Sequence, residues 1–541
     1  MADSSASEKQ SSWQMVDKQV FVIAGVVCLL VIISTLLFPA QAADVIAGLF
    51  SGMTTNFGWF YMLLMAIFVA FALFLAFSRY GNVKLGKDDD KPEFSFASWF
   101  FMLFSAGMGI GLVFYSVAAP MSFFIQPPTA EPGTIQAAQD AMHYTFLHWG
   151  LHPWAAYVVI GAGLGYFQHR MGKPALLSSV FVPLFGEKAC NGLFGKIVDA
   201  LAVIVTVFGV TTSLGMGAIQ ISGGLGYEFG LPSGIPTMLA VVVIATIIYT
   251  VASVSGVDKG ISLCANVNLW IMIGVMVFLF IAGNTTFLMD YFTESLGNYL
   301  TNIVKDSFWV DAFSQTNGWI DGWTIFFWAW WIAWAPFVGG FIARISKGRT
   351  IREFVIGALI FPSILSFFFM TVLGGNAIDL TLNGGVTAIS EAITKDVSLG
   401  LFAMLNQMPL SGLLSVLCMV LLLVFFITSA NGATLVCSMM TSRGVQNPPK
   451  RIIVFWSLVL GATAVGLLLA GGLSSVQTIS VIGAFPFGFI CLGVIVAVVK
   501  ALKNEFDPES GARRSLEETI AADQTWYDDR PIETRPAKEV A

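Results

Sequence analysis

Long apolar segments, separated by short polar stretches, run through nearly the whole chain. A helix of about 20 residues is long enough to cross the hydrocarbon core of a bilayer, which is about 30 Å thick. The pattern predicts twelve such helices, at residues 20–39, 59–78, 97–124, 143–167, 198–226, 235–253, 260–284, 322–344, 353–374, 409–438, 452–471 and 475–499. Two weaker, amphipathic segments, 291–305 and 386–406, are predicted to form surface helices outside the membrane.

The composition agrees with a polytopic, all-α membrane protein. Of the 541 residues, 56% are hydrophobic and 11% are charged, and the mean hydropathy is +0.79. A soluble domain carries about 25% charged residues. The first apolar run is followed by further spans, so we interpret it as a transmembrane helix and not as a cleaved signal peptide.

The positions of Lys and Arg predict the orientation of the spans. If the N-terminus is inside, the outer loops hold only Lys305 and Lys395 of the 27 Lys and Arg residues. Cytoplasmic loops of membrane proteins are enriched in these residues, so we expect both termini to be cytoplasmic. The C-terminal segment 501–541 is rich in Asp and Glu and is predicted to be a solvated tail.

Tryptophans gather in the stretch WTIFFWAWWIAWAP at 323–336, and more flank Pro153 in HWGLHPWAAY at 148–157. Membrane tryptophans usually lie at the water interfaces, but these lie within apolar runs. Exposed ring faces attract diffuse cations such as quaternary ammonium groups. On a helix, Trp331 and Trp334 share a face, and Trp330 and Trp334 also share a face. Bulky packing and an interface belt remain the alternatives.

Two further segments have a functional and a structural interpretation. Gly107, Gly109 and Gly111 alternate within the third span, which favours either local unwinding around a ligand or close helix packing. Thr428 and Ser429 lie deep in the tenth span, where hydroxyls either bond to their own helix or hold a ligand.

Several classes of function lack their motifs. The chain has no Walker motif, HExxH, GxSxG or Cys/His cluster, so we expect neither an enzyme nor a cofactor. The spans carry no acidic ring or repeated filter of the kind that channels use. These absences favour a carrier, and no feature indicates a nucleic-acid partner.

Three segments resemble the betaine/choline/carnitine transporter family: residues 322–354, GWTIFFWAWWIAWAPFVGGFIARISKGRTIREF, with AGMGIG at 106–111 and HWGLHPWAAY at 148–157. The resemblance implies a bacterial inner-membrane protein that forms homotrimers. It also implies a LeuT-type core of two inverted five-helix repeats, preceded by two additional helices. The implied parts are a cytoplasmic tail (1–19), the two extra helices (20–90), the first repeat (91–284), a periplasmic amphipathic segment (285–321), the second repeat (322–500) and the acidic tail (501–541).

The resemblance also implies the site. An aromatic box would consist of Trp149, Trp154, Tyr157 and Trp331, with Trp334 near the substrate path and Trp330 behind it. The stretch with Gly107, Gly109 and Gly111 would receive a carboxylate. A sodium ion would be held by backbone oxygens of Ser105, Met108 and Phe425 and by the hydroxyls of Thr428 and Ser429. A second sodium site would use Thr206 and Phe337, but Val210 stands where relatives have another threonine.

The resulting hypothesis is a sodium-coupled importer of a zwitterionic methylated onium solute, glycine betaine first and dimethylsulfoniopropionate close behind. Proton-coupled choline relatives carry Asp at the position of Gly111, which argues against proton coupling and against choline. A sodium-independent exchanger of the carnitine/butyrobetaine kind and an osmotically gated channel or sensor are the alternatives. The acidic tail does not support osmotic activation.

Overall fold

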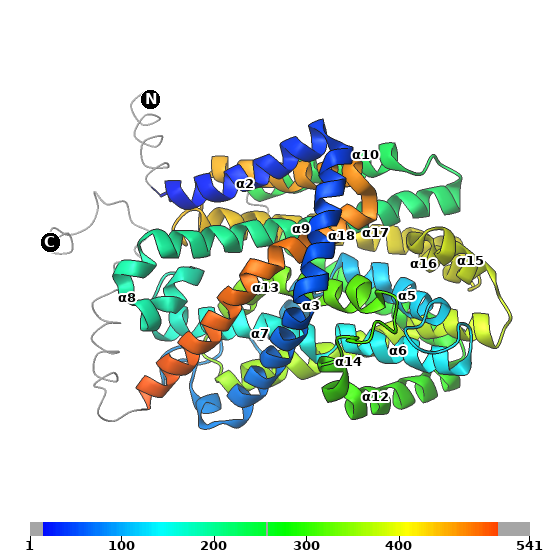
Figure 1. The fold of residues 1–541 in the computed structure, drawn as a ribbon, viewed down its shortest axis with the longest axis horizontal. Helices are drawn as coiled ribbons and strands as arrows, with labels where there is room; N and C mark the ends of the chain where they lie inside the picture. Colours follow the sequence, from blue (N-terminus) through cyan, green and yellow to red (C-terminus); the bar gives the residue numbers. More distant parts are fainter. Residues whose placement is uncertain (1–14, 256–257, 507–541) are drawn as a thin grey trace.

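The structure, a computed structural model, describes residues 15–255 and 258–506 as a bundle of α-helices (Figure 1). The long helices are α2 (Lys18–Leu37), α3 (Pro39–Phe77), α4 (Phe96–Gly107), α5 (Ile110–Ile125), α6 (Ile135–Trp149), α7 (Leu151–Gly165), α9 (Leu193–Phe229), α10 (Ile235–Ser255), α11 (Asp258–Ala282), α12 (Thr285–Ser307), α13 (Phe326–Ile345), α14 (Ile351–Leu382), α17 (Ser411–Met440) and α18 (Lys450–Glu505). Shorter helical segments are η1 (Arg79–Asn82), η2 (Tyr166–Arg170), η3 (Leu177–Phe181), α8 (Val182–Cys190), η4 (Ile320–Ile325), α15 (Ala388–Lys395), η5 (Val397–Leu399) and α16 (Gly400–Leu405). The predicted all-α membrane fold is confirmed.

The lengths of the helices give fewer spans than the apolar pattern predicts. Within the described residues, nine helices are long and apolar enough to cross a membrane, or ten if α4 and α5 together form one bent span. The 56 residues of α18 cover two predicted spans and would be about 84 Å long if straight. A kink at Gly471–Gly472, where Gly472 has φ +58°, divides α18 where the sequence predicts a loop. The count of twelve stays a prediction.

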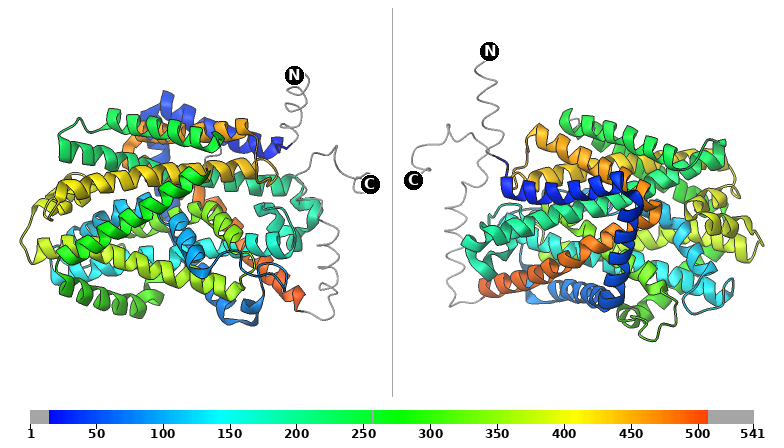
Figure 2. Two further views of the ribbon diagram at one scale, coloured as in Figure 1. Left: turned by 180° about the vertical axis from the view of Figure 1, so that it is seen from behind. Right: turned by 45° about the horizontal axis from the view of Figure 1, so that its top comes forward.

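Two predicted spans are broken, and a third is longer than expected. α4 and α5 meet at an angle of 66° at Met108–Gly109, as one interpretation of the glycine stretch predicts. The fourth predicted span divides at Gly150, between α6 and α7. The second predicted span, 59–78, is part of the 39-residue α3, which already begins at Pro39 and crosses the neighbouring helices (Figure 2).

The tryptophan-rich helix α13 lies at the centre of the bundle. It packs against α7, α9 and α18. In the most apolar stretch of Ile320–Ile345, 89% of the residues are buried, compared with 33% in α2 and 22% in α10. The tryptophans of this helix therefore face other helices, and most do not belong to an interface belt.

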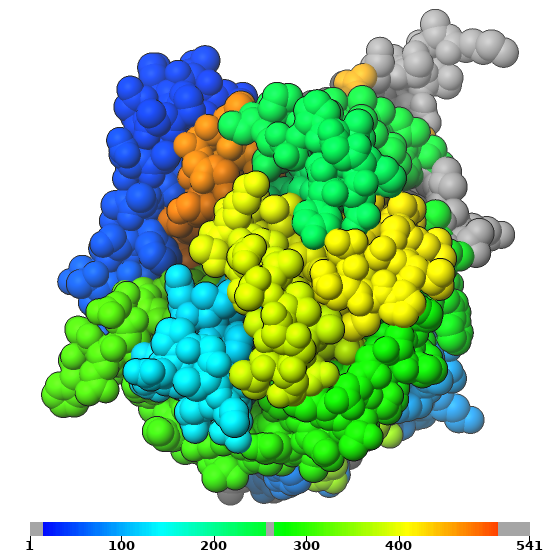
Figure 3. All heavy atoms as spheres, turned by 90° about the vertical axis from the view of Figure 1, so that its right-hand side faces the viewer, coloured from blue at the N-terminus to red at the C-terminus, as the bar shows by residue number. Residues whose placement is uncertain are grey.

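The two ends of the bundle differ. The first turn of α2, the short α8 and the last turn of α18 lie at one end, and α15 and α16 lie at the other (Figure 1). Figure 3 looks onto the second end, where the yellow segment around α15 and α16 covers the middle of the face. Both predicted surface segments are helical, in α12 and in α15–α16. Most of the two predicted tails, 1–14 and 507–541, lies outside the described residues.

Candidate functional site

The four residues of the aromatic box come together from α6, α7 and α13. Each side chain is at most 2% exposed. The ring centroids of Trp149 and Trp331 lie 4.9 Å apart, those of Trp331 and Tyr157 6.3 Å, and those of Tyr157 and Trp154 5.5 Å. The interplanar angles are 79°, 89° and 89°, so successive rings stand nearly perpendicular. Successive rings therefore pack edge to face, one against the next, in the order Trp149, Trp331, Tyr157 and Trp154.

The break at Gly150 positions these rings. Trp149 ends α6, and Trp154 follows in the first turns of α7. Pro153 is tolerated there because the first turn of a helix needs no amide donor. Trp331 Nε1 donates to the backbone oxygen of His148 at 2.9 Å, which ties α13 to the last turn of α6.

Three polar atoms of the box are buried without a hydrogen-bond partner among the described residues. They are Nε1 of Trp149, Nε1 of Trp154 and the hydroxyl of Tyr157. Buried donors are nearly always satisfied, so a cluster of three requires an explanation. A bound ligand with acceptor oxygens, or ordered water, would satisfy them.

Trp330 and Trp334 back the box and have partners of their own. Both indole N–H groups donate to the backbone oxygen of Gly209 in α9, at 3.3 and 2.8 Å. The ring of Trp330 also stacks on Trp331, with centroids 4.7 Å apart and an interplanar angle of 23°. Trp330 therefore supports the wall that Trp331 forms.

The glycines of the third span serve both unwinding and close packing. Gly109 lies in the break between α4 and α5. A Cβ at Gly107 would stand 2.5 Å from Cη2 of Trp154, and one at Gly111 would stand 2.2 Å from Cη2 of Trp330. These two glycines thus allow the break to lie directly against rings of the site.

The predicted sodium ligands lie on the two sides of this break. A Cβ at Gly109 would be 3.4 Å from Oγ of Ser429 and 3.8 Å from the ring of Phe425, so α17 passes close to the break. Ser105 lies in the last turn of α4, whose final carbonyls lack intrahelical donors, and Met108 has extended backbone.

Thr428 bonds to its own helix, as the structural interpretation predicts. Its hydroxyl donates to the backbone oxygens of Val424 at 2.9 Å and Phe425 at 3.3 Å. A hydroxyl that donates keeps lone pairs for a cation, so this bond is compatible with an ion ligand. Carbonyl and hydroxyl oxygens are the donors that hard cations prefer, so the predicted set has the donor types that a sodium ion would take.

The residues of the possible second sodium site also make structural contacts. The hydroxyl of Thr206 donates to the backbone oxygen of Ala202 at 2.7 Å. The ring of Phe337 packs beside Trp334, with centroids 5.7 Å apart, and a Cβ at Gly432 would be 3.0 Å from it. These contacts describe packing and give no added support to a second ion.

Tyr115 of α5 lies beside the aromatic box, although it is not among the site residues predicted from the sequence. Its ring lies 6.3 Å from Trp149 and 6.0 Å from Trp330, and its hydroxyl accepts a hydrogen bond from Gln477 Nε2 at 2.6 Å. Tyr115 stands four residues after Gly111, on the same helix face, and this spacing was the available signal.

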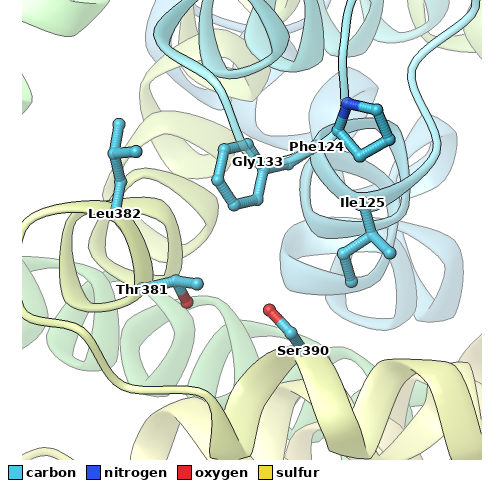
Figure 4. Close-up of a pocket in the computed structure, with 7 residues that line it drawn as sticks. Phe124, Ile125, Gly133, Thr381, Leu382 and Ser390 are labelled. Atoms are coloured by element: carbon cyan, nitrogen blue, oxygen red, sulfur yellow. The ribbon is translucent and has the colours of Figure 1, made fainter.

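A separate pocket of ≈ 360 Å³ opens near α15, at the end of the bundle (Figure 4). It is lined by Phe124, Ile125, Pro132, Gly133, Thr381, Leu382 and Ser390. The hydroxyls of Thr381 and Ser390 point into it, and the rest of the lining is mostly apolar (Figure 4). None of these residues belongs to the aromatic box, so the pocket is not the candidate site.

Residues 19–507 match the family described as betaine/carnitine/choline family transporter, BCCT. The chain belongs to this family. A probable glycine betaine transporter of Desulfitobacterium hafniense (strain Y51) is 45% identical over 91% of this chain and 99% of its own length. The glycine betaine transporter OpuD of Bacillus subtilis (strain 168) is 46% identical over 84% of this chain and 88% of its own.

A third relative is the osmo-independent choline transporter of Acinetobacter baylyi (strain ATCC 33305 / BD413 / ADP1). It is 39% identical over 87% of this chain and 90% of its own length. The family predicted from the three sequence segments is confirmed. This BCCT protein is a membrane transporter and not an enzyme.

Proposed function

We propose that this transporter imports a zwitterionic methylated onium solute, glycine betaine first, in symport with sodium. The observation that carries the proposal is the box of nearly perpendicular rings with three unpartnered donors. Two of the similar proteins carry glycine betaine in their names. Dimethylsulfoniopropionate is the second candidate, because a sulfonium is also a diffuse cation with apolar substituents.

The chemistry of the box suits both ends of such a solute. A quaternary ammonium has no N–H to satisfy, and each ring face contributes about 0.5–2 kcal/mol to its binding. The carboxylate can be received by the glycine stretch, where Gly107 lies against Trp154, and can also accept hydrogen bonds from the unpartnered indole N–H groups of Trp149 and Trp154 and the Tyr157 hydroxyl. A zwitterion thus satisfies the buried donors and brings its own counter-charge, which a bare cation such as choline does not.

Sodium coupling is supported by the position of the candidate ion ligands. Gly109 faces Ser429, and the neighbouring Gly107 and Gly111 lie against Trp154 and Trp330. An ion that joins the end of α4 to α17 would fix the break, and with it the rings that rest on the glycines. Because the two sites share this backbone, ion and substrate would each favour the other's binding.

The test is uptake of radiolabelled glycine betaine by the purified protein in liposomes. An inward sodium gradient should drive accumulation, and an equal potassium gradient should not. Unlabelled dimethylsulfoniopropionate, carnitine, choline and ectoine serve as competitors. Uptake that is indifferent to sodium but driven by preloaded substrate would replace symport by exchange, and non-saturable flux would indicate a channel.

The proposal includes the arrangement in the membrane. We infer that both termini face the cytoplasm of a bacterial plasma membrane, from the distribution of Lys and Arg, and that the protein forms homotrimers, from the family resemblance. Single cysteines placed near Lys18 and Lys395 should react with an impermeant reagent only at the second position in intact cells.

A further inference from the structure

The helix α12 packs against α6 and α14, beside the break at Gly150. It is not among the helices long and apolar enough to span a membrane within the described part of the chain. Nevertheless several of its side chains are buried, among them Tyr299 at 1% exposure and Asp306 at 4%. Asp306 bonds to α6, and Tyr299 bonds to α7.

Tyr299 lies directly at the break. Its hydroxyl accepts a hydrogen bond from the backbone N–H of Leu151 at 3.1 Å. Leu151 begins α7, and the first amides of a helix have no partner within the helix. A Cβ at Gly150 would stand 2.7 Å from the same hydroxyl and 2.7 Å from the ring of Phe367. The absence of a side chain at Gly150 thus lets Tyr299 reach the backbone.

The last turn of α12 bonds to both sides of the break. Asp306 Oδ2 lies 2.6 Å from Nε2 of His143 in α6. Its neighbour Ser307 lies 2.8 Å from Nε2 of His152 in α7. The hydroxyl hydrogen of Ser307 is donated to Ile303, so His152 must donate to Ser307. Two adjacent residues of α12 therefore hold one histidine on each side of Gly150.

The opposite side of the break is held by the aromatic box. Trp331 donates to the backbone oxygen of His148, three residues before Leu151. The backbone around Trp149 is thus fixed between Trp331 on the substrate side and Tyr299 on the outer side. A change in either contact alters the angle between α6, which carries Trp149, and α7, which carries Trp154 and Tyr157.

We propose that α12 is a splint across the break between α6 and α7, with Tyr299 as the positioning residue that sets the geometry of the aromatic box. Tyr299 does not contact the box rings and acts through the Leu151 amide. The consequence for substrate affinity rests on the proposed function of the box. The effect on the backbone does not depend on it.

The test compares Tyr299→Phe with Tyr291→Phe in the full-length protein. Both variants lose one buried hydroxyl of α12 and keep the ring. Tyr291 donates to the backbone oxygen of Ala138, three turns before the break, and is the matched control. We expect Tyr299→Phe to speed hydrogen–deuterium exchange in peptides covering 146–155 and to weaken glycine betaine binding about five-fold. The control should change neither, and both variants should melt alike.

The possible outcomes distinguish a failure of the proposed role of α12 from a failure of the proposed transport function. If wild type does not bind glycine betaine, the proposed function fails, and exchange in 146–155 still tests the splint. Unchanged exchange in Tyr299→Phe, or equal effects of both variants, would overturn the splint. If Tyr299→Phe does not fold, Ser307→Ala is tested instead. This variant removes the partner of His152 and should speed exchange in the same peptides. Unaltered exchange in Ser307→Ala would also overturn the proposal that α12 is a splint.

Discussion

Substitution of Gly111 by alanine should damage substrate binding through a ring that the new methyl group displaces. The Cβ would lie 2.2 Å from Cη2 of Trp330 and 3.0 Å from its Cζ2. Carbon atoms in contact are about 3.5 Å apart, so the ring must move by about 1 Å. Trp330 stacks on Trp331 at 4.7 Å and bonds to Gly209, so the displacement passes to the wall of the box.

The size of the effect follows from the cost of overpacking. An extra methyl in a close-packed interior costs about 1–3 kcal/mol. If Trp331 moves to relieve this strain, a similar free energy is lost from binding, which corresponds to about a 5- to 150-fold rise in Kd. Alanine is a better helix former than glycine by about 1 kcal/mol, so the helix itself should not melt.

Isothermal titration of the purified Gly111→Ala variant with glycine betaine measures this loss. Gly274→Ala in α11 is the matched control, because no atom outside its own helix backbone lies within 4 Å of a Cβ at that position. The control should bind as wild type does. Binding by Gly111→Ala within two-fold of wild type would refute the idea that Trp330 transmits strain to the box.

Three further outcomes are expected. Trp331→Leu should abolish glycine betaine binding but leave assembly intact by size-exclusion chromatography; full affinity would refute the box. Ser429→Ala should raise the sodium concentration for half-maximal uptake about ten-fold, because one hard oxygen ligand is lost, and uptake at saturating sodium should recover. The third outcome concerns Asp311, which accepts hydrogen bonds from Thr316 and Gln315. Desolvation raises the pKa of the Asp311 carboxyl group, but these hydrogen bonds lower it, and the net shift is downward. The contribution of Asp311 to the order of the loop 308–318 is therefore present above the pKa of free Asp, and it is lost as the pH falls through the lowered pKa. Limited proteolysis of residues 308–318 should accelerate only in acid.

Local features of the sequence predict the parts of the site that depend on local structure. Alternating glycines weaken a helix wherever they occur, so the break near Gly109 is predictable. The cluster around Trp331 is equally visible, because five tryptophans within one apolar run have few ordinary explanations. The structure adds that Gly107 and Gly111 have a packing role, which depends on rings from two other helices.

Features that depend on distant residues are not predictable in this way. The break at Gly150 is stabilised by Tyr299, which bonds to Leu151 and lies 148 residues after it in the chain. Pro153, three residues after Gly150, is a local signal of a helix start, but it does not indicate which residues hold the break. The extension of α3 back to Pro39 is not predictable for another reason. Residues 39–58 belong to the helix, but they mix polar and apolar positions, which lowers their hydropathy.

The deep burial of α13 has a consequence for biosynthesis. Its neighbours α7 and α9 precede it in the chain, but α18, which also packs against it, is made later and is the last helix of the described residues. A chain that leaves the ribosome in order must therefore hold a tryptophan-rich helix in the bilayer, with the side that later meets α18 open to lipid, until α18 arrives. The packing of α18 then acts as the closing step of assembly around α13.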